Sequence, residues 1–143
     1  MPKVFFNNAD RNCTITGKMS IKVFISNIFL LENITLARVD YIFCSDNYLL
    51  EINKKFLQHD YFTDIITFPL SEINFPIVAE IYISLERVKE NALNHKVFIF
   101  NELLRVLFHG ALHLCGYADN DINQKLIMRT KEDFYINLFH VKH

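Results

Sequence analysis

Hydrophobic positions along this chain follow two spacings, and each spacing predicts one kind of element. Short β-branched and aromatic runs, which favour strands, occupy residues 3–7, 38–44, 64–68 and 80–84. Apolar residues three or four apart, as on one face of a helix, occupy residues 20–33, 45–57, 84–93, 96–115 and 121–139. Side chains suited to capping a helix N-terminus begin four of these segments, namely Ser20, Ser45 or Asp46, Ser84 and Asp121.

The predicted elements follow one another in the order β-α-β-α-β-β-α-α-α. Strands mixed with helices indicate an α/β (α+β) fold, with a mixed sheet of about four strands and helices packed against it. Helical crossovers allow parallel neighbours, whereas residues 64–68 and 80–84 could pair as a hairpin. Residues 96–115 are apolar on all sides, so we expect this helix at the centre. The length fits a single domain over residues 1–143.

Composition and charge exclude several classes of protein. The formal net charge of −1 gives no overall signature of nucleic-acid binding, so any RNA contact needs a local basic patch or a metal ion. No apolar run approaches the roughly 20 residues of a membrane span, and the first residues lack the apolar core of a signal peptide. The 3 widely spaced cysteines argue against a disulfide framework. We therefore expect a cytoplasmic protein that does not associate with a membrane.

The sequence F-H-G-A-L-H-L-C-G-Y-A-D-N-D carries the candidate chemistry. His109 and His113 lie four residues apart in a predicted helix, which places both side chains on one face. Gly116 suits the left-handed turn that ends a helix, and the reversal would bring Asp119 back towards the histidines. Three such ligands with an open fourth position describe a catalytic zinc site. The sequence therefore predicts one Zn²⁺ per chain.

The sequence alone does not decide the third metal ligand or the general base of this site. Asp121 or His59 could supply the third ligand instead. Zinc proteases carry a glutamate after the first histidine as general base, and Gly110 at that position excludes their arrangement. No other side chain is an obvious base. The weak candidates are Glu102, about two turns before the first histidine, and Asp64 in the third strand.

Three stretches of the chain resemble motifs of a known family. The stretch from His109 to Tyr117, H-G-A-L-H-L-C-G-Y, is similar to the signature of the YbeY endoribonucleases, the bacterial rRNA maturation factors. Residues 63–69, T-D-I-I-T-F-P, and residues 79–84, A-E-I-Y-I-S, resemble two strand motifs of the same family. The resemblance extends from about residue 20 to the end of the chain.

The resemblance implies a function and a set of partners. It implies a zinc-dependent, single-strand-specific endoribonuclease acting in rRNA processing and ribosome biogenesis, with His109, His113 and Asp119 as metal ligands. The partners would be single-stranded segments of rRNA and the ribosome or its proteins. A catalytic zinc lowers the pKa of bound water towards ~7, which would supply a nucleophile for the phosphodiester bond. An activated 2′-hydroxyl is a second route, and the sequence does not choose between them.

Two positions depart from the family pattern. Asp119 stands where the family has a third histidine, and carboxylate oxygen and imidazole nitrogen bind zinc at similar distances, roughly 2.0–2.2 Å. We expect the negative charge of Asp119 to make the bound water less acidic than in a three-histidine site. Leu57 stands where the family has an arginine, so a cation that could hold a phosphate is missing.

Cations elsewhere in the chain are candidates for RNA contacts. Lys54 and Lys55 precede the third strand, and Arg105 lies on the metal-binding helix. Grooves for single-stranded RNA combine such cations with aromatic platforms, for which Tyr61 is a candidate. Two other functions stay open: a metalloprotease-like or other zinc hydrolase, and a non-catalytic, ribosome-associated RNA-binding protein. Cleavage of RNA rather than peptide would exclude the first, and a cleavage-dead variant that still functions would favour the second.

Overall fold

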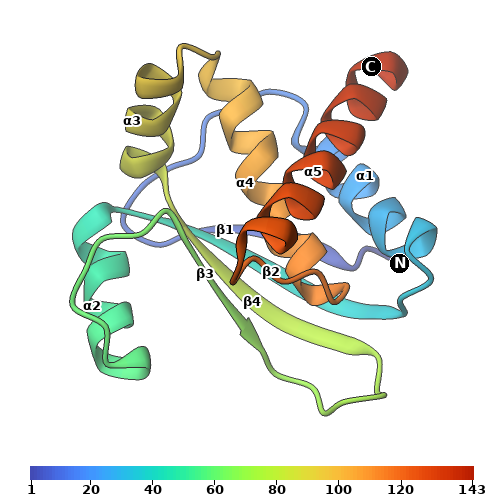
Figure 1. The fold of residues 1–143 in the computed structure, drawn as a ribbon, viewed down its shortest axis with the longest axis horizontal. Coiled ribbons are helices and arrows are strands. Elements are labelled where there is room, and N and C mark those ends of the chain that lie inside the picture. The colour runs from blue at the N-terminus through green and yellow to red at the C-terminus, as the bar shows by residue number, and fades with distance from the viewer.

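The computed structural model describes residues 1–143, and a four-stranded mixed sheet lies at its centre (Figure 1). The strands are β1 (Val4–Asn8), β2 (Leu36–Cys44), β3 (Ile65–Pro69) and β4 (Ile77–Ser84), in the spatial order β1-β2-β4-β3. The pairs β1–β2 and β2–β4 are parallel, whereas β3 runs antiparallel to β4. The sequence prediction of a mixed sheet that includes one hairpin is therefore confirmed.

Five helices cover the two faces of this sheet. They are α1 (Lys18–Leu31), α2 (Asp46–Leu57), α3 (Leu85–His95), α4 (Ile99–Leu114) and α5 (Ile122–Lys142). Figure 1 shows α1, α4 and α5 on one side of the sheet and α2 on the other. The order of strands and helices along the chain is the predicted one.

Helix boundaries agree with the predictions where a side chain caps the helix. Ser45, Ser84 and Asp121 each accept a hydrogen bond from the backbone N–H three residues later, at 2.8–3.1 Å. The prediction for Ser20 is wrong, because α1 begins at Lys18 after Gly17, whose φ of 73° is left-handed. A glycine adopts that conformation without strain, so the backbone and not a side chain begins α1.

The metal-binding helix is shorter than its apolar pattern predicts. It was expected over residues 96–115, but α4 begins at Ile99. Lys96 adopts a left-handed conformation, with φ 57°, and ends α3 as its C-cap. This reversal separates α3 from α4.

No single helix is both long and apolar enough to cross a membrane. Helices α3 and α4 together would meet those two requirements, but the pair is bent by 118°.

The core lies mainly between the sheet and the three helices on its first side. Inward residues of the central strands, such as Tyr41 and Ile81, pack against α1, α4 and α5, and α4 is central as predicted. Gly110 faces the sheet at close range, since a Cβ there would lie 3.0 Å from Cδ1 of both Ile65 and Ile81. The missing side chain therefore lets α4 approach β3 and β4 closely, which brings the neighbouring His109 beside β3.

Candidate metal centre

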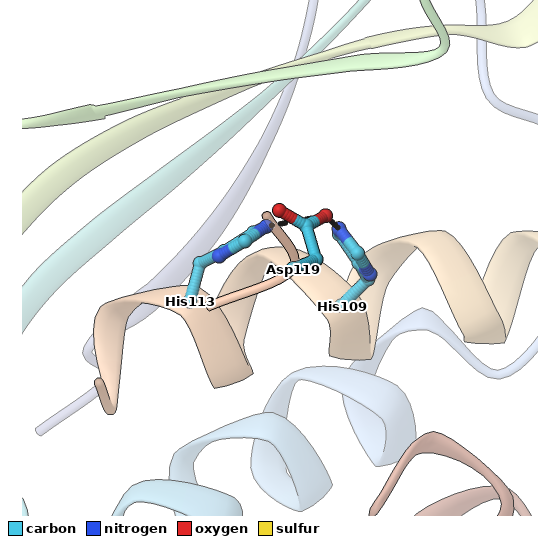
Figure 2. Close-up of side chains that lie close together, drawn as sticks. All are labelled: His109, His113 and Asp119. Atoms are coloured by element: carbon cyan, nitrogen blue, oxygen red, sulfur yellow. Dashed lines mark ion pairs between the residues drawn. The ribbon is translucent and has the colours of Figure 1, made fainter. Parts of the chain in front are cut away.

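Three side chains predicted as metal ligands meet at the C-terminal end of α4. Nε2 of His109 and Nε2 of His113 each lie 3.3 Å from Oδ2 of Asp119. Figure 2 shows both imidazoles rising from α4 on the side that faces the strands, with the carboxylate between them. Their potential ligand atoms lie within 4.8 Å of one another. We call these three residues the metal triad.

The turn after α4 positions both the second and the third member of the triad. Gly116 adopts φ 105° and reverses the chain, which brings Asp119 back over the helix. The carbonyl oxygen of Tyr117 lies 2.8 Å from Nδ1 of His113. The hydroxyl of Tyr117 in turn donates to Oε1 of Glu32, 2.7 Å away at the end of α1. The turn is thus attached to the body of the protein and also orients one imidazole.

A buried carboxylate orients the other imidazole. Oε2 of Glu132, on α5, lies 2.6 Å from Nδ1 of His109. Arg105 donates to Oε1 of the same carboxylate at 2.9 Å and to Oδ1 of Asp133 at 2.6 Å. Sequence reasoning missed Glu132, although one signal was present: it is an acidic residue in the apolar stripe of α5, four positions after the buried Met128.

The hydrogen bonds around the triad suit it for a divalent cation. Glu132 and the carbonyl of Tyr117 both accept, so each histidine in its neutral form carries its proton on Nδ1. Both Nε2 lone pairs then face the carboxylate of Asp119, and three acceptors converge with no donor between them. A cation satisfies all three groups at once. Two nitrogens and one oxygen with room for further ligands form a donor set typical of catalytic metal sites.

Charge and exposure also affect what this site can bind. Burial of His109 disfavours its protonated form and lowers its pKa. The hydrogen bond and negative charge of Glu132 act in the opposite direction, as do the charges of Asp119 and Asp64. These effects outweigh burial, so the pKa of His109 is raised. A proton and a metal ion therefore compete for this side chain. The triad side chains are 22–37% exposed, so a substrate can reach an ion held there.

The other two candidates for the third ligand stand outside the triad. Asp121 accepts from the backbone N–H of Gln124 and caps α5. His59 stacks on Tyr61 with ring centroids 5.1 Å apart, and it is exposed. Of the three residues that the sequence left open, Asp119 is the one that the fold brings to the histidine pair.

Two cavities meet at the triad. The larger, about 570 Å³, is lined by β3 and by residues before it, including Asn53, Leu57, His59 and Tyr61. The smaller, about 400 Å³, is lined by residues of α3, α4 and α5. They share four residues, namely Asp64, Ile65, His109 and Asp119. A substrate bound across the metal triad can therefore extend into both cavities.

Comparison with known proteins identifies the family. Residues 6–140 match the model of the family described as Endoribonuclease YbeY. The chain belongs to the YbeY family. It is 51% identical over 118 residues to Endoribonuclease YbeY of Flavobacterium psychrophilum, which covers 82% of this chain and 84% of that protein. It is 43% identical over 135 residues to the Cytophaga hutchinsonii protein of the same name, covering 94% of each.

A solved structure has the same fold. The solution structure of a protein from Thermotoga maritima matches with a TM-score of 0.68 and 27% identity, over 97% of this chain and 90% of that one. The α/β fold and the YbeY resemblance predicted from the sequence are both confirmed, and membership of an endoribonuclease family supports the prediction of a hydrolase that acts as a nuclease.

Within this YbeY fold, the remaining sequence candidates have different surroundings. Asp64 lies where the two cavities join, and burial raises the pKa of its carboxyl group. Glu102 is buried beside the smaller cavity, 3.8 Å from Nδ1 of His95. Lys54 and Lys55 line neither cavity, and Lys54 pairs with two exposed carboxylates.

Proposed function

We propose that this YbeY-family protein is a zinc-dependent endoribonuclease that cleaves single-stranded RNA in rRNA processing and ribosome biogenesis. The observation that carries the proposal is the triad of His109, His113 and Asp119, whose ligand atoms converge where two cavities meet. The nuclease activity and the RNA substrate come from the names of the family and of the curated relatives. The donor set supports zinc, because two imidazoles and one carboxylate form a common catalytic zinc site.

Each residue of the site has a defined task under this proposal. The two histidines present Nε2 to the ion because their Nδ1 atoms are already occupied. Asp119 supplies a carboxylate oxygen and one negative charge. A zinc ion bound there supplies a Lewis acid for a phosphoryl oxygen and lowers the pKa of coordinated water.

Proton transfer is assigned to Asp64 in preference to Glu102. Asp64 lines both cavities beside His109 and Asp119, within reach of a substrate bound at the triad, and burial raises the pKa of its carboxyl group. Glu102 lines the smaller cavity alone. Gly110 offers no side chain at the position where zinc proteases carry their base.

Zinc content and RNA cleavage, measured together on matched variants, test the proposal. Wild-type protein is expected to contain about one zinc per chain and to cleave single-stranded but not duplex oligonucleotides. His113→Ala and Asp119→Ala are expected to lose both properties. His59→Ala is the matched control, because this histidine lines the larger cavity but stands outside the triad. Zinc retained in both triad variants, or peptide cleavage in place of RNA cleavage, would contradict the proposal.

Association with the ribosome or its proteins is part of the same proposal and needs its own experiment. Wild-type protein is expected to sediment with ribosomal particles in a sucrose gradient. If the His113→Ala protein still restores rRNA maturation in cells that lack the enzyme, the protein acts as a binding factor and not as a nuclease.

A further inference from the structure

We propose that Lys125 and Arg129 on α5 bind the phosphodiester backbone of the RNA in the smaller cavity, on the side of the metal triad away from Leu57. This inference rests on the proposed function, since it concerns how that substrate is held. It assigns a phosphate-binding role to two residues that no motif in the sequence marks.

The larger cavity lacks the charge that an RNA backbone needs. Its lining contains no lysine or arginine, and Leu57 stands there where the family motif has an arginine. Its aromatic member Tyr61 is exposed and suits a nucleobase, which it can contact by stacking. Phosphates carry full negative charges, and proteins that bind single strands meet them with cations. Cations that line the cavity on the other side of the triad can supply this charge.

The smaller cavity contains three arginine and lysine side chains, of which two are free. Arg105 is held by Glu132 at 2.9 Å and by Asp133 at 2.6 Å. Lys125 and Arg129 also line the cavity, are exposed, and have no carboxylate within 4.0 Å. They lie four residues apart on α5, so both project from one face of the helix. Two adjacent cations with no partner thus lie beside His109 and Asp119.

The acidic groups of the smaller cavity already have other partners. Asp119 faces the two histidines, and Glu132 binds His109 and Arg105. Glu102 lies 3.8 Å from Nδ1 of His95. Asp64 accepts a hydrogen bond from the side-chain amide of Asn91 at 3.4 Å. The charges of the two free cations are therefore available to a ligand.

The position of Lys125 points the same way. It lies close to the N-terminal end of α5, whose first turn has no acidic residue. A cation there is unfavourable for the helix, because the helix dipole is positive at this end. An anion is favourable for the same reason, although the N-cap Asp121 already accepts from the backbone N–H of Gln124. The lining of the smaller cavity, and not the helix end, therefore carries the assignment.

The resulting path places a base in the larger cavity and the following phosphates beside α5. The strand crosses the metal triad between them, which brings one phosphodiester group to the ion. This arrangement would let the chain bind RNA although its net charge is −1.

Fluorescence anisotropy with a short 2′-O-methyl single-stranded oligonucleotide, which resists cleavage through the 2′-hydroxyl, tests the inference on the zinc-loaded protein. The variant is Lys125→Ala with Arg129→Ala. The comparison variant is Lys54→Ala with Lys55→Ala, which removes the same charge from the two lysines that the sequence offered as RNA contacts and that line neither cavity. Losing two phosphate contacts should weaken binding at least about tenfold at low salt and reduce the slope of log affinity against log salt by about 1.4.

Each outcome of this experiment has a distinct meaning. Loss of affinity in the α5 variant alone, with unchanged zinc content and with recovery in Lys125→Arg with Arg129→Lys, would support the assignment. Equal loss in both double variants, or loss in the Lys54 and Lys55 variant alone, would overturn it. If wild-type protein binds no single-stranded RNA, the proposed function itself fails.

Discussion

Glu132 should determine how tightly the site holds its metal, although it is not a ligand. Its carboxylate accepts from Nδ1 of His109 at 2.6 Å and from Arg105 at 2.9 Å. Glu132→Ala would leave a buried imidazole N–H without an acceptor and free the ring to rotate. Glu132→Gln would keep an oxygen for that N–H but remove the negative charge. Partners of this kind change metal affinity by about 10- to 100-fold, or about 1.4–2.7 kcal/mol.

The two substitutions therefore separate orientation from charge. We expect the glutamine variant near the lower end of this range and the alanine variant near the upper end. Zinc affinity would be measured by competition with a chromophoric chelator. Asp133→Asn is the control, because it removes the other partner of Arg105 without touching His109. Imidazole ¹⁵N spectra should show His109 protonated on Nδ1 in the wild type and the glutamine variant, and a mixture of tautomers in the alanine variant.

Two results would refute this reasoning. The first is unchanged zinc affinity in a folded Glu132→Ala protein, which would mean that His109 is oriented by packing alone. The second is an equal loss of affinity in Asp133→Asn, which would mean that the effect follows the charge of Arg105 and not the hydrogen bond to His109. If Glu132→Ala does not fold, the conclusion is drawn from Glu132→Gln, because glutamine has nearly the same shape as glutamate.

Three further predictions concern other parts of the structure. Gly110→Ala should destabilise the protein by up to about 2 kcal/mol in chemical denaturation, because an added Cβ at 3.0 Å from the sheet costs about 1–3 kcal/mol and alanine returns about 1 kcal/mol of helix propensity. Equal or higher stability would mean that the ends of Ile65 and Ile81 yield freely. Burial raises the pKa of Glu32, but hydrogen bonds from Tyr135 and Tyr117 and the charge of Lys131 outweigh it and lower the pKa overall. The ionised Glu32 therefore stabilises the folded protein fully at a pH above its unfolded pKa of 4.5, and this contribution is lost as the pH falls through its folded pKa. Glu32→Gln should thus make the free energy of unfolding depend less on pH on the acid side. Parallel curves for the two proteins would contradict this. Asp119→His should move the acidic limb of the pH–rate profile to lower pH, because a neutral ligand leaves more positive charge on the site and makes bound water more acidic. An acidic limb that stays in place or moves to higher pH would contradict the expectation that Asp119 makes this water less acidic.

The features that the sequence predicted well are local ones. The order of strands and helices follows from spacings within a few residues, and the histidine pair follows from a separation of one helical turn. The position of Asp119 was accessible because a single glycine turn connects it to α4. Side-chain caps fixed three helix starts. In each case the interacting groups are neighbours along the chain.

The features that the sequence missed depend on contacts between distant segments. Glu132 meets His109 across 23 residues, and no spacing links α5 to the histidine motif. Arg105 stays a predicted RNA contact, but nothing in the sequence indicates the two carboxylates on α5 that it contacts, because an arginine on a helix looks the same whether it faces solvent or another helix. The start of α4 was misplaced because Lys96, which is not a glycine, adopts a left-handed turn that no residue preference indicates.

The close approach of α4 to the sheet at Gly110 also limits how this site could be redesigned. A glutamate at that position would complete the motif of a zinc protease. The new side chain would have to begin where Ile65 and Ile81 already lie 3.0 Å from its first carbon. An engineer, or a natural lineage, would have to move these two isoleucine side chains or replace them with smaller residues to accommodate the glutamate. The barrier between these two kinds of hydrolase would then lie in the packing of the core, because the metal ligands themselves could stay the same.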